Sequence, residues 1–363
     1  MAVNSTATTQ PIDFQACWPK ALDPTLKPLA LNVAKVAWNI FSLIISPIAH
    51  IRLSISELRN WAFEKLIDKT NHSTPEEVEE QGDQLAQNHE IKRLSIKTPD
   101  GTTLDAGFFE GDTHTDKAVL FVPGLGSAWQ SIAEYGGITT LGTHVLALSV
   151  RGFGLSEKGD RTEKNYGLDV WSAYQYLIKE KGIDPSNILV VGHSFGGAAG
   201  AVGASLIQEE YPEAETKMVH WSSFSSLAKA VKHLIKRNLR LPLHLEKVLA
   251  KVASLLIHIL GGNINSVAAL AKLKQKVVVW AREDRIIPMQ AQMKKKIGKP
   301  EYAQGTTYAL ELVADSPEDS LEYSHSRVLH PEEELGLRVA CSQLLGLGPP
   351  GDLQDHYIRM TVI

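Results

Sequence analysis

The sequence predicts an α/β fold with a mostly parallel central sheet flanked by helices. Short, continuously apolar runs recur between residues 118 and 280, and such runs suit strands that are buried on both faces of a parallel sheet. Segments with helical character separate these runs, and strands that alternate with helices indicate an α/β fold. The chain has 363 residues, which is enough for one large domain with an appendage.

The expected elements follow one another along the chain. Residues 91–111 hold two alternating apolar runs around Pro99-Asp100-Gly101, which predicts a β-hairpin. Helices are expected at 166–182 and 195–210. Buried strands are expected at residues 118–124, 144–150, 187–193, 217–221, 276–280 and 307–313.

Three domain-level segments are predicted. Residues 1–90 form a helical N-terminal extension, residues 91–347 the main domain, and residues 348–363 a C-terminal tail. Within the extension, Ser73-Thr74-Pro75-Glu76-Glu77 favours a helix start, with a capping residue, a proline in the first turn and acids near the positive end of the helix. Residues 224–274 break the strand–helix alternation and predict a long helical insertion.

Composition excludes several classes of function. The chain is 44% hydrophobic and 21% charged with a formal net charge of −4, which argues against a nucleic-acid partner. Its two cysteines, Cys17 and Cys341, lie far apart, so neither a disulfide framework nor a cysteine zinc site is indicated. The histidines are scattered, and neither a metal nor another cofactor is expected.

The N-terminal region bears on localisation. The first 20 residues lack the pattern of a secretory signal, so we expect a cytoplasmic or peripheral membrane protein, or an effector secreted without such a signal. The uncharged run 36–51 is shorter than the roughly 20 residues of a membrane span. It suits a helix packed on the main domain, and it also suits a helix in a membrane interface with Trp38 and Phe41 as anchors.

The segment Gly192-His193-Ser194-Phe195-Gly196 matches the pattern G-x-S-x-G. It follows an apolar strand-like run and opens a helix of small residues, which is the context that a nucleophile elbow requires. The sharp turn needs small residues two positions before and after the serine, and both are glycine here. Ser194 is therefore expected at the carboxyl end of the sheet, where open α/β sheets bind ligands.

Further motifs follow in a fixed order. Pro123-Gly124-Leu125-Gly126 follows a strand, Arg151–Ser156 reads RGFGLS after the next strand, and Ala281–Pro288 reads AREDRIIP around Asp284. With these motifs the chain resembles the α/β-hydrolase superfamily over residues 91–347. They are similar to the family's oxyanion loop, its R-G-x-G-x-S turn and its G-x-x-D-x-I-V-P acid loop. The resemblance implies an α/β-hydrolase fold with the order serine, acid, histidine.

The rest of a catalytic triad is expected after the nucleophile. A serine hydroxyl needs an adjacent base, and histidine suits this task because its pKa lies near 6.5. Asp284 would orient the imidazole, with Glu283 as a weaker alternative. His325 is expected to be the base, because it lies in the loop where the family carries its histidine. His330 precedes a helix start and is the alternative.

The resemblance also implies an oxyanion hole formed by the backbone N–H groups of Phe195 and Leu125. The common family pattern has histidine where this chain has Pro123. The donor is a backbone group, so the departure removes a supporting side chain and not the donor itself. His193 and Arg151 are expected to be structural.

In this family, a segment placed like residues 224–274 forms a cap over the active site. The spacing of its apolar residues predicts a helix, and such a cap would favour a small-molecule or acylated substrate with an apolar group. Ordinary packing of the cap explains the spacing equally well. Its basic residues form a solvated face or meet an anionic headgroup; they are Lys229, Lys232, Lys236, Arg237, Arg240, Lys247 and Lys251.

The expected activity is hydrolysis of a carboxylic ester or thioester by an esterase, lipase or thioesterase, through a Ser-His-Asp triad and an acyl-enzyme. Two alternatives are a non-catalytic α/β-hydrolase scaffold that binds a ligand or partner, and a serine peptidase. The apolar N-terminal extension is similar to that of hydrolase-like proteins of chlamydiae and legionellae, which implies a bacterial protein that acts on lipids or acylated proteins.

Overall fold

The computed structural model describes about two thirds of the chain. The described residues are 60, 74–88, 91–112, 114–238, 243–259, 261–282, 284, 286–296, 299, 305–312, 325, 329, 331–347 and 361–362. The apolar run 36–51, Cys17 and most of the predicted tail lie outside them.

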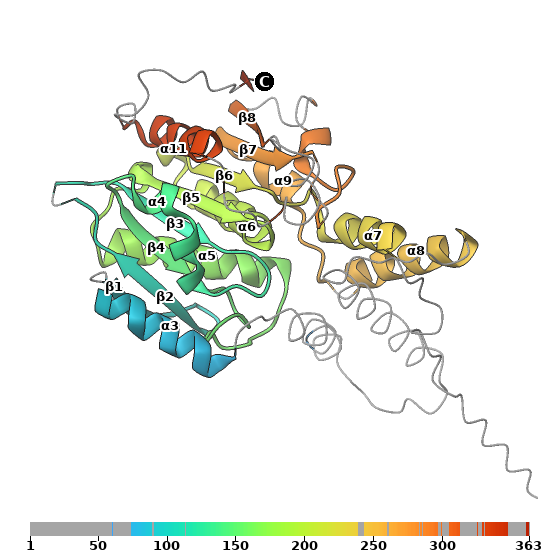
Figure 1. Cartoon of the computed structure of the whole chain (residues 1–363), viewed down its shortest axis with the longest axis horizontal. Coiled ribbons are helices and arrows are strands. Elements are labelled where there is room, and N and C mark those ends of the chain that lie inside the picture. The colour runs from blue at the N-terminus through green and yellow to red at the C-terminus, as the bar shows by residue number, and fades with distance from the viewer. Residues whose placement is uncertain are drawn as a thin grey trace, which may run out of the picture.

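In the described part of the chain, nine strands form one sheet in the order β1-β2-β4-β3-β5-β6-β7-β8-β9. The strands from β4 to β8 in this order pair in parallel, and β1, β2 and β9 are antiparallel additions at the two edges. The α/β-hydrolase fold predicted from the sequence is confirmed (Figure 1). The strands are β1 (Ile91–Lys97), β2 (Thr103–Phe109), β3 (Ala118–Val122), β4 (His144–Leu148), β5 (Ile188–His193), β6 (Lys217–Trp221), β7 (Gln275–Ala281), β8 (Thr306–Leu312) and β9 (Thr361–Val362).

The first two strands form the hairpin that the sequence predicts. Lys97 pairs with Thr103 at its closed end. Gly101 takes φ +89° and donates its N–H to the carbonyl of Thr98 at 2.9 Å. A positive φ is easy only for glycine, so Gly101 sets the turn and with it the pairing of the two strands.

Helices cover both faces of the sheet. On one face lie α5 (Glu163–Lys179), α6 (Phe195–Glu210) and α9 (Ser266–Leu270). The other face carries η1 (Trp129–Glu134), α4 (Gly136–Thr139) and α11 (Pro331–Leu345). The remaining short helices are η2 (Pro185–Asn187), η3 (Pro212–Ala214) and η4 (Met293–Lys295).

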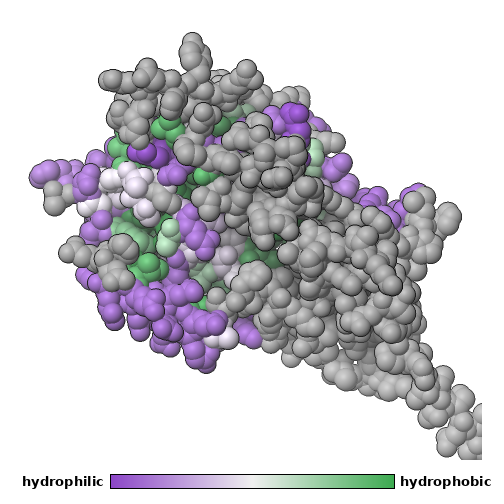
Figure 2. All heavy atoms as spheres, viewed as in Figure 1, coloured by the Kyte–Doolittle hydropathy of each residue, from purple (hydrophilic) through white to green (hydrophobic). Residues whose placement is uncertain are grey.

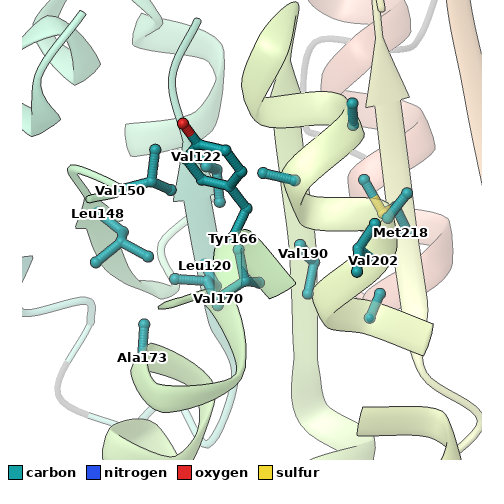
Figure 3. Packing of buried hydrophobic residues seen from close by; sticks show 14 of the residues in the cluster. Leu120, Val122, Leu148, Val150, Tyr166, Val170, Ala173, Val190, Val202 and Met218 are labelled. Carbon is teal, nitrogen blue, oxygen red and sulfur yellow. The ribbon is translucent and has the colours of Figure 1, made fainter. Parts of the chain in front are cut away.

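The alternation of side chains along each strand builds two cores. Leu120 and Val122 of β3 belong to the cluster under α5 and α6, whereas Val119 and Phe121 belong to the cluster under η1 and α11. Figure 3 shows the first cluster, in which Leu120 and Val190 of the strands lie among side chains of α5 and α6. Buried on both faces, the sheet is a rigid base for the loops at its carboxyl edge.

The helix start predicted near residue 74 is confirmed. In α3 (Pro75–Asn88) the hydroxyl of Thr74 accepts the N–H of Glu77 at 3.2 Å, and the Glu77 carboxylate accepts the N–H of Thr74 at 2.7 Å. This reciprocal pair is a capping box. The helix contacts the main domain, since Gln130 donates to the carbonyl of Val78 at 2.9 Å. Figure 2 shows hydrophilic residues on the surface where α3 lies in Figure 1.

The insertion predicted at residues 224–274 contains two kinds of structure. Helices α7 (Leu227–Asn238) and α8 (Leu243–Ile259) form a hairpin that projects from the sheet (Figure 1). Beyond it, Ile264 and Leu273 are buried in the core with α9. The Leu227 N–H donates to the Ile264 carbonyl at 3.0 Å, so the two ends of the hairpin meet. No helix in the described residues has the length and apolar character of a membrane span.

Candidate active site

The serine of the G-x-S-x-G motif lies in a strained turn between β5 and α6. Ser194 takes φ +53° and ψ −120°, a backbone conformation that side-chain-bearing residues rarely adopt and that marks functional turns. A Cβ on Gly196 would lie 2.1 Å from the Val122 carbonyl oxygen, and one on Gly192 would lie 2.4 Å from the Gly196 carbonyl oxygen. Only glycine fits at either position, as the elbow motif predicts.

Two distant segments bring a histidine and an acid to this serine. His325 Nε2 lies 2.7 Å from Ser194 Oγ, and His325 Nδ1 lies 2.7 Å from Asp284 Oδ2. All three side chains are nearly buried, with 7% of Ser194, 7% of His325 and 2% of Asp284 exposed. Burial excludes competing water from both hydrogen bonds, which strengthens them. The structure thus joins the three residues that the sequence singles out in one hydrogen-bonded chain.

The surroundings of Asp284 determine which atoms donate and which accept in the hydrogen bonds that link Asp284, His325 and Ser194. Its Oδ1 accepts the backbone N–H groups of Ile286 and Ile287 at 2.9 and 2.7 Å, so the carboxylate cannot rotate freely. Because Oδ2 is an acceptor, His325 Nδ1 must carry the proton, and Nε2 is left to accept the Ser194 hydroxyl. This is the tautomer that a general base needs. The alternatives considered from the sequence, Glu283 and His330, lie outside the described residues.

The predicted oxyanion loop passes beside the nucleophile. A Cβ on Gly124 would lie 3.2 Å from Ser194 Cβ and 3.7 Å from its Oγ, so the backbone before Leu125 is in close reach of the serine. Phe195 is the first residue of α6, and the first N–H groups of a helix have no partner within it. The two predicted donors therefore come from segments that border Ser194.

His193 is predicted from the sequence to be structural, whereas its partner Tyr135 is not predicted from the sequence. His193 Nε2 lies 3.0 Å from the backbone carbonyl of His325, and its Nδ1 lies 3.1 Å from the Tyr135 hydroxyl. A carbonyl only accepts, so Nε2 donates to it and Nδ1 accepts from Tyr135. Burial, followed by the nearby His325, lowers the pKa of His193 to about 3, which keeps its ring neutral. No motif marks Tyr135, which comes from the η1–α4 junction on the other face of the sheet.

Arg151 is structural, as the sequence analysis expected. Its guanidinium is fully buried and binds Asp169 of α5 at 2.7 Å and Asp100 of the β1–β2 turn at 2.7 Å. The guanidinium holds the pKa of the Asp100 carboxyl well below its usual range. The R-G-x-G-x-S turn therefore ties the hairpin to α5 and contributes no group to the serine–histidine–acid chain.

Apolar side chains surround the nucleophile. The Phe195 ring packs between Phe153 at 5.4 Å, Tyr166 at 5.0 Å and Phe224 at 6.4 Å. Partly exposed apolar side chains lie on two loops and at one helix start at this edge of the sheet, namely Leu125, Ile286 and Leu227 of α7. Within the described residues no group of three or more histidine, cysteine, aspartate or glutamate side chains is arranged to hold a metal ion.

This arrangement of strands, helices and site residues is that of a known protein family. Residues 119–335 match the alpha/beta hydrolase family. The chain belongs to this family. As an alpha/beta hydrolase it carries serine, acid and histidine in the family's order, with the serine at the strand–helix elbow.

Part of this alpha/beta hydrolase is similar to two very long bacterial proteins. A stretch of 128 residues is 34% identical to the multifunctional-autoprocessing repeats-in-toxin protein of Vibrio vulnificus, which is 33% of this chain and 2% of that protein. A stretch of 114 residues is 37% identical to the protein of the same name from Vibrio cholerae, covering 31% and 2%. The chain thus matches only a small fraction of the length of these relatives.

Solved structures share the fold. An alpha-beta hydrolase from Vibrio vulnificus superposes with a TM-score of 0.55 at 20% identity, over 74% of this chain and 90% of that one. A puromycin-hydrolyzing peptidase of Mycobacterium tuberculosis has a TM-score of 0.50 at 15% identity, over 72% and 40%. At these identities the likeness concerns the fold alone.

Proposed function

We propose that this alpha/beta hydrolase cleaves carboxylic esters or thioesters through an acyl-enzyme on Ser194. The observation that carries the proposal is the continuous chain of two 2.7 Å hydrogen bonds from Ser194 Oγ through His325 to Asp284. A serine becomes a useful nucleophile when a base accepts its proton and a third group orients that base. Ser194, His325 and Asp284 have this relation.

The reaction follows from these positions. Ser194 Oγ attacks the carbonyl carbon while His325 Nε2 takes the hydroxyl proton, and Asp284 stabilises the imidazolium that forms. The N–H groups of Phe195 and Leu125 hold the oxyanion, each donor contributing about 10²–10³ in rate. As the C–O or C–S bond breaks, His325 returns the proton to the leaving alcohol or thiol. A water activated by His325 then releases the acid.

The substrate class is inferred from the lining of this edge of the sheet. Leu125 after β3, Leu227 at the start of α7 and Ile286 after β7 offer partly exposed apolar surface on the segments that follow strands at this edge of the sheet. Small-molecule sites are mostly apolar with a few convergent polar groups. We therefore propose an apolar acyl group as the part of the substrate that is recognised.

Covalent labelling and a substrate panel test the proposal. A fluorophosphonate probe is expected to label the wild-type chain and not Ser194→Ala, whereas Ser95→Ala, at an exposed serine of β1, is the matched control and should label fully. p-Nitrophenyl esters of increasing chain length, acyl thioesters and peptides then separate the classes. Cleavage of peptides alone would indicate a serine peptidase. A folded protein that neither labels nor hydrolyses would indicate a non-catalytic scaffold.

A further inference from the structure

Helix α8, the second helix of the α7–α8 hairpin, exposes large apolar side chains to solvent. Val248, Leu255 and Ile259 are exposed to 56%, 57% and 59%, and they are the large hydrophobic residues that stand exposed in the described part of the chain. All three belong to α8. At roughly 100° per residue they fall within about 40° of one another around the helix axis. They therefore form one continuous stripe, which we call the α8 stripe.

Basic side chains flank the α8 stripe. Lys247 and Lys251 are exposed and lie about 60–100° around the helix from Val248, on one side of the stripe. Glu246 is the single acidic residue of α8. An apolar stripe bordered by lysines is typical of helices that lie in a membrane interface.

The charge of the whole hairpin points the same way. Helices α7 and α8 hold six lysine and arginine residues against one glutamate, a net charge of +5. The chain carries −4 in total, so the rest of it carries −9. The positive charge is thus concentrated in the element that projects from the domain (Figure 1), where it can meet an anionic surface without bringing the acidic remainder close.

We propose that the α8 stripe and its flanking Lys247 and Lys251 dock this protein on an anionic lipid surface. The apolar side chains enter the boundary between headgroups and acyl chains, and the lysines meet anionic headgroups. A second copy of the chain fits less well. An antiparallel two-fold contact along the stripe would set the lysines of one copy against the lysines of the other.

The docking goes beyond the proposed catalysis and does not depend on it. Helix α7 begins at Leu227, just after Phe224, whose ring lies 6.4 Å from that of Phe195 beside the nucleophile. A docked hairpin would therefore hold the start of α7, and Ser194 near it, close to the lipid surface. Binding can be measured with Ser194→Ala, which separates the failure of docking from the failure of catalysis.

Vesicle sedimentation with the full chain is the test. The wild type and Ser194→Ala are expected to bind vesicles of phosphatidylcholine with phosphatidylserine, to bind pure phosphatidylcholine far less, and to lose affinity as salt is raised. Substituting Lys247 and Lys251 with glutamine should lower the apparent affinity about fivefold per lysine. Substituting Val248, Leu255 and Ile259 together with serine should lower it at least about tenfold.

The controls make the assignment specific. Lys92 and Lys97, both exposed on β1, changed together to glutamine remove the same charge elsewhere and should leave binding unchanged. Thermal melting checks that each variant folds. Three results would overturn the proposal: no binding to anionic vesicles, an equal loss in the β1 control, or full binding by the triple serine variant, which would move the contact to another segment such as residues 36–51. Self-association of the wild type that the serine variant abolishes, without vesicle binding, would assign the stripe to a second copy.

Discussion

The hydrogen bond from His193 to the backbone of His325 is expected to matter for turnover. Replacing His193 with phenylalanine keeps a ring of similar size against Trp221, 5.1 Å away, and Tyr135, 5.5 Å away. It removes the N–H that donates to the His325 carbonyl at 3.0 Å. We expect kcat for a soluble ester to fall while KM changes little, because the His193 side chain is buried and leaves little surface for a substrate to contact.

The size of the effect follows from what the change leaves behind. A buried carbonyl that loses its donor costs about 1–3 kcal/mol. If this cost destabilises the position of His325 that reaches Ser194, the fraction of molecules with His325 aligned drops by about 5- to 140-fold, because 1.4 kcal/mol is a factor of ten. The fall in kcat should lie in that range. Tyr135→Phe removes only the bond to Nδ1 and should lower stability by about 1 kcal/mol with a small effect on kcat.

Steady-state kinetics below the melting temperature, together with rates of fluorophosphonate labelling, measure this effect. His193→Gln is the conservative control, because its amide N–H can donate to the same carbonyl, and most of kcat should return. An unchanged kcat in His193→Phe, with only the melting temperature lowered, would show that His193 supports folding alone. Equal loss in the phenylalanine and glutamine variants would refute the hydrogen bond as the cause.

Three further predictions concern the acid Asp284, the elbow glycine Gly196 and the buried His220. Asp284→Asn should lower kcat about 10³–10⁴-fold, because two backbone N–H groups hold the amide oxygen on their side and turn the NH₂ toward His325 Nδ1; near-normal kcat would argue against the assigned tautomer. Gly196→Ala should unfold the protein or abolish labelling, since its Cβ would lie 2.1 Å from a backbone oxygen. Gly200→Ala in the same helix would place its Cβ 3.0 Å from the flexible end of Met218 and 3.4 Å from a Val190 methyl group, and it should be tolerated. Burial lowers the pKa of His220 to about 3, and neither ring nitrogen has a hydrogen-bond partner in another residue of the described part of the chain. The unfolded chain binds the extra proton, so this share of stability is complete above about pH 6.5 and is lost as the pH falls toward 3. In denaturant titrations His220→Leu should therefore spare about 2 kcal/mol of the loss between pH 7 and 5, and a loss as steep as that of the wild type would contradict the pKa.

Local chemistry explains why much of the fold and the elbow could be predicted from the sequence. The apolar runs had to be strands because their residues are buried on both faces, and the predicted run 217–221 coincides with β6. The elbow was visible because the turn at Ser194 excludes a Cβ at Gly192 and Gly196, so the constraint is written in adjacent residues. The order of the motifs predicted that the site residues lie together, because each motif follows a strand that ends at the same edge of the sheet.

What the sequence could not provide depends on tertiary packing. Tyr135 belongs to a short helix junction with no motif, and its bond to His193 exists only because its ring packs among Phe121, His193 and Trp221 of three different strands. Likewise, Ile264 and Leu273 have the same apolar character as residues of the α7–α8 hairpin. The spacing of apolar residues alone could not show that these two residues belong to the core and not to the projecting hairpin.

Two consecutive residues at the end of β5, His193 and Ser194, both bind the base His325. Ser194 binds the His325 ring at 2.7 Å, and its neighbour His193 binds the His325 backbone at 3.0 Å. The elbow itself cannot shift easily, because Ser194 donates its N–H to the Trp221 carbonyl at 2.8 Å and the glycines around it have no space. Any displacement of the histidine loop must therefore break bonds to both residues at once. The strained turn thus does more than present a hydroxyl: it also fixes where the imidazole meets it, which is why a change at His193 should be felt in kcat.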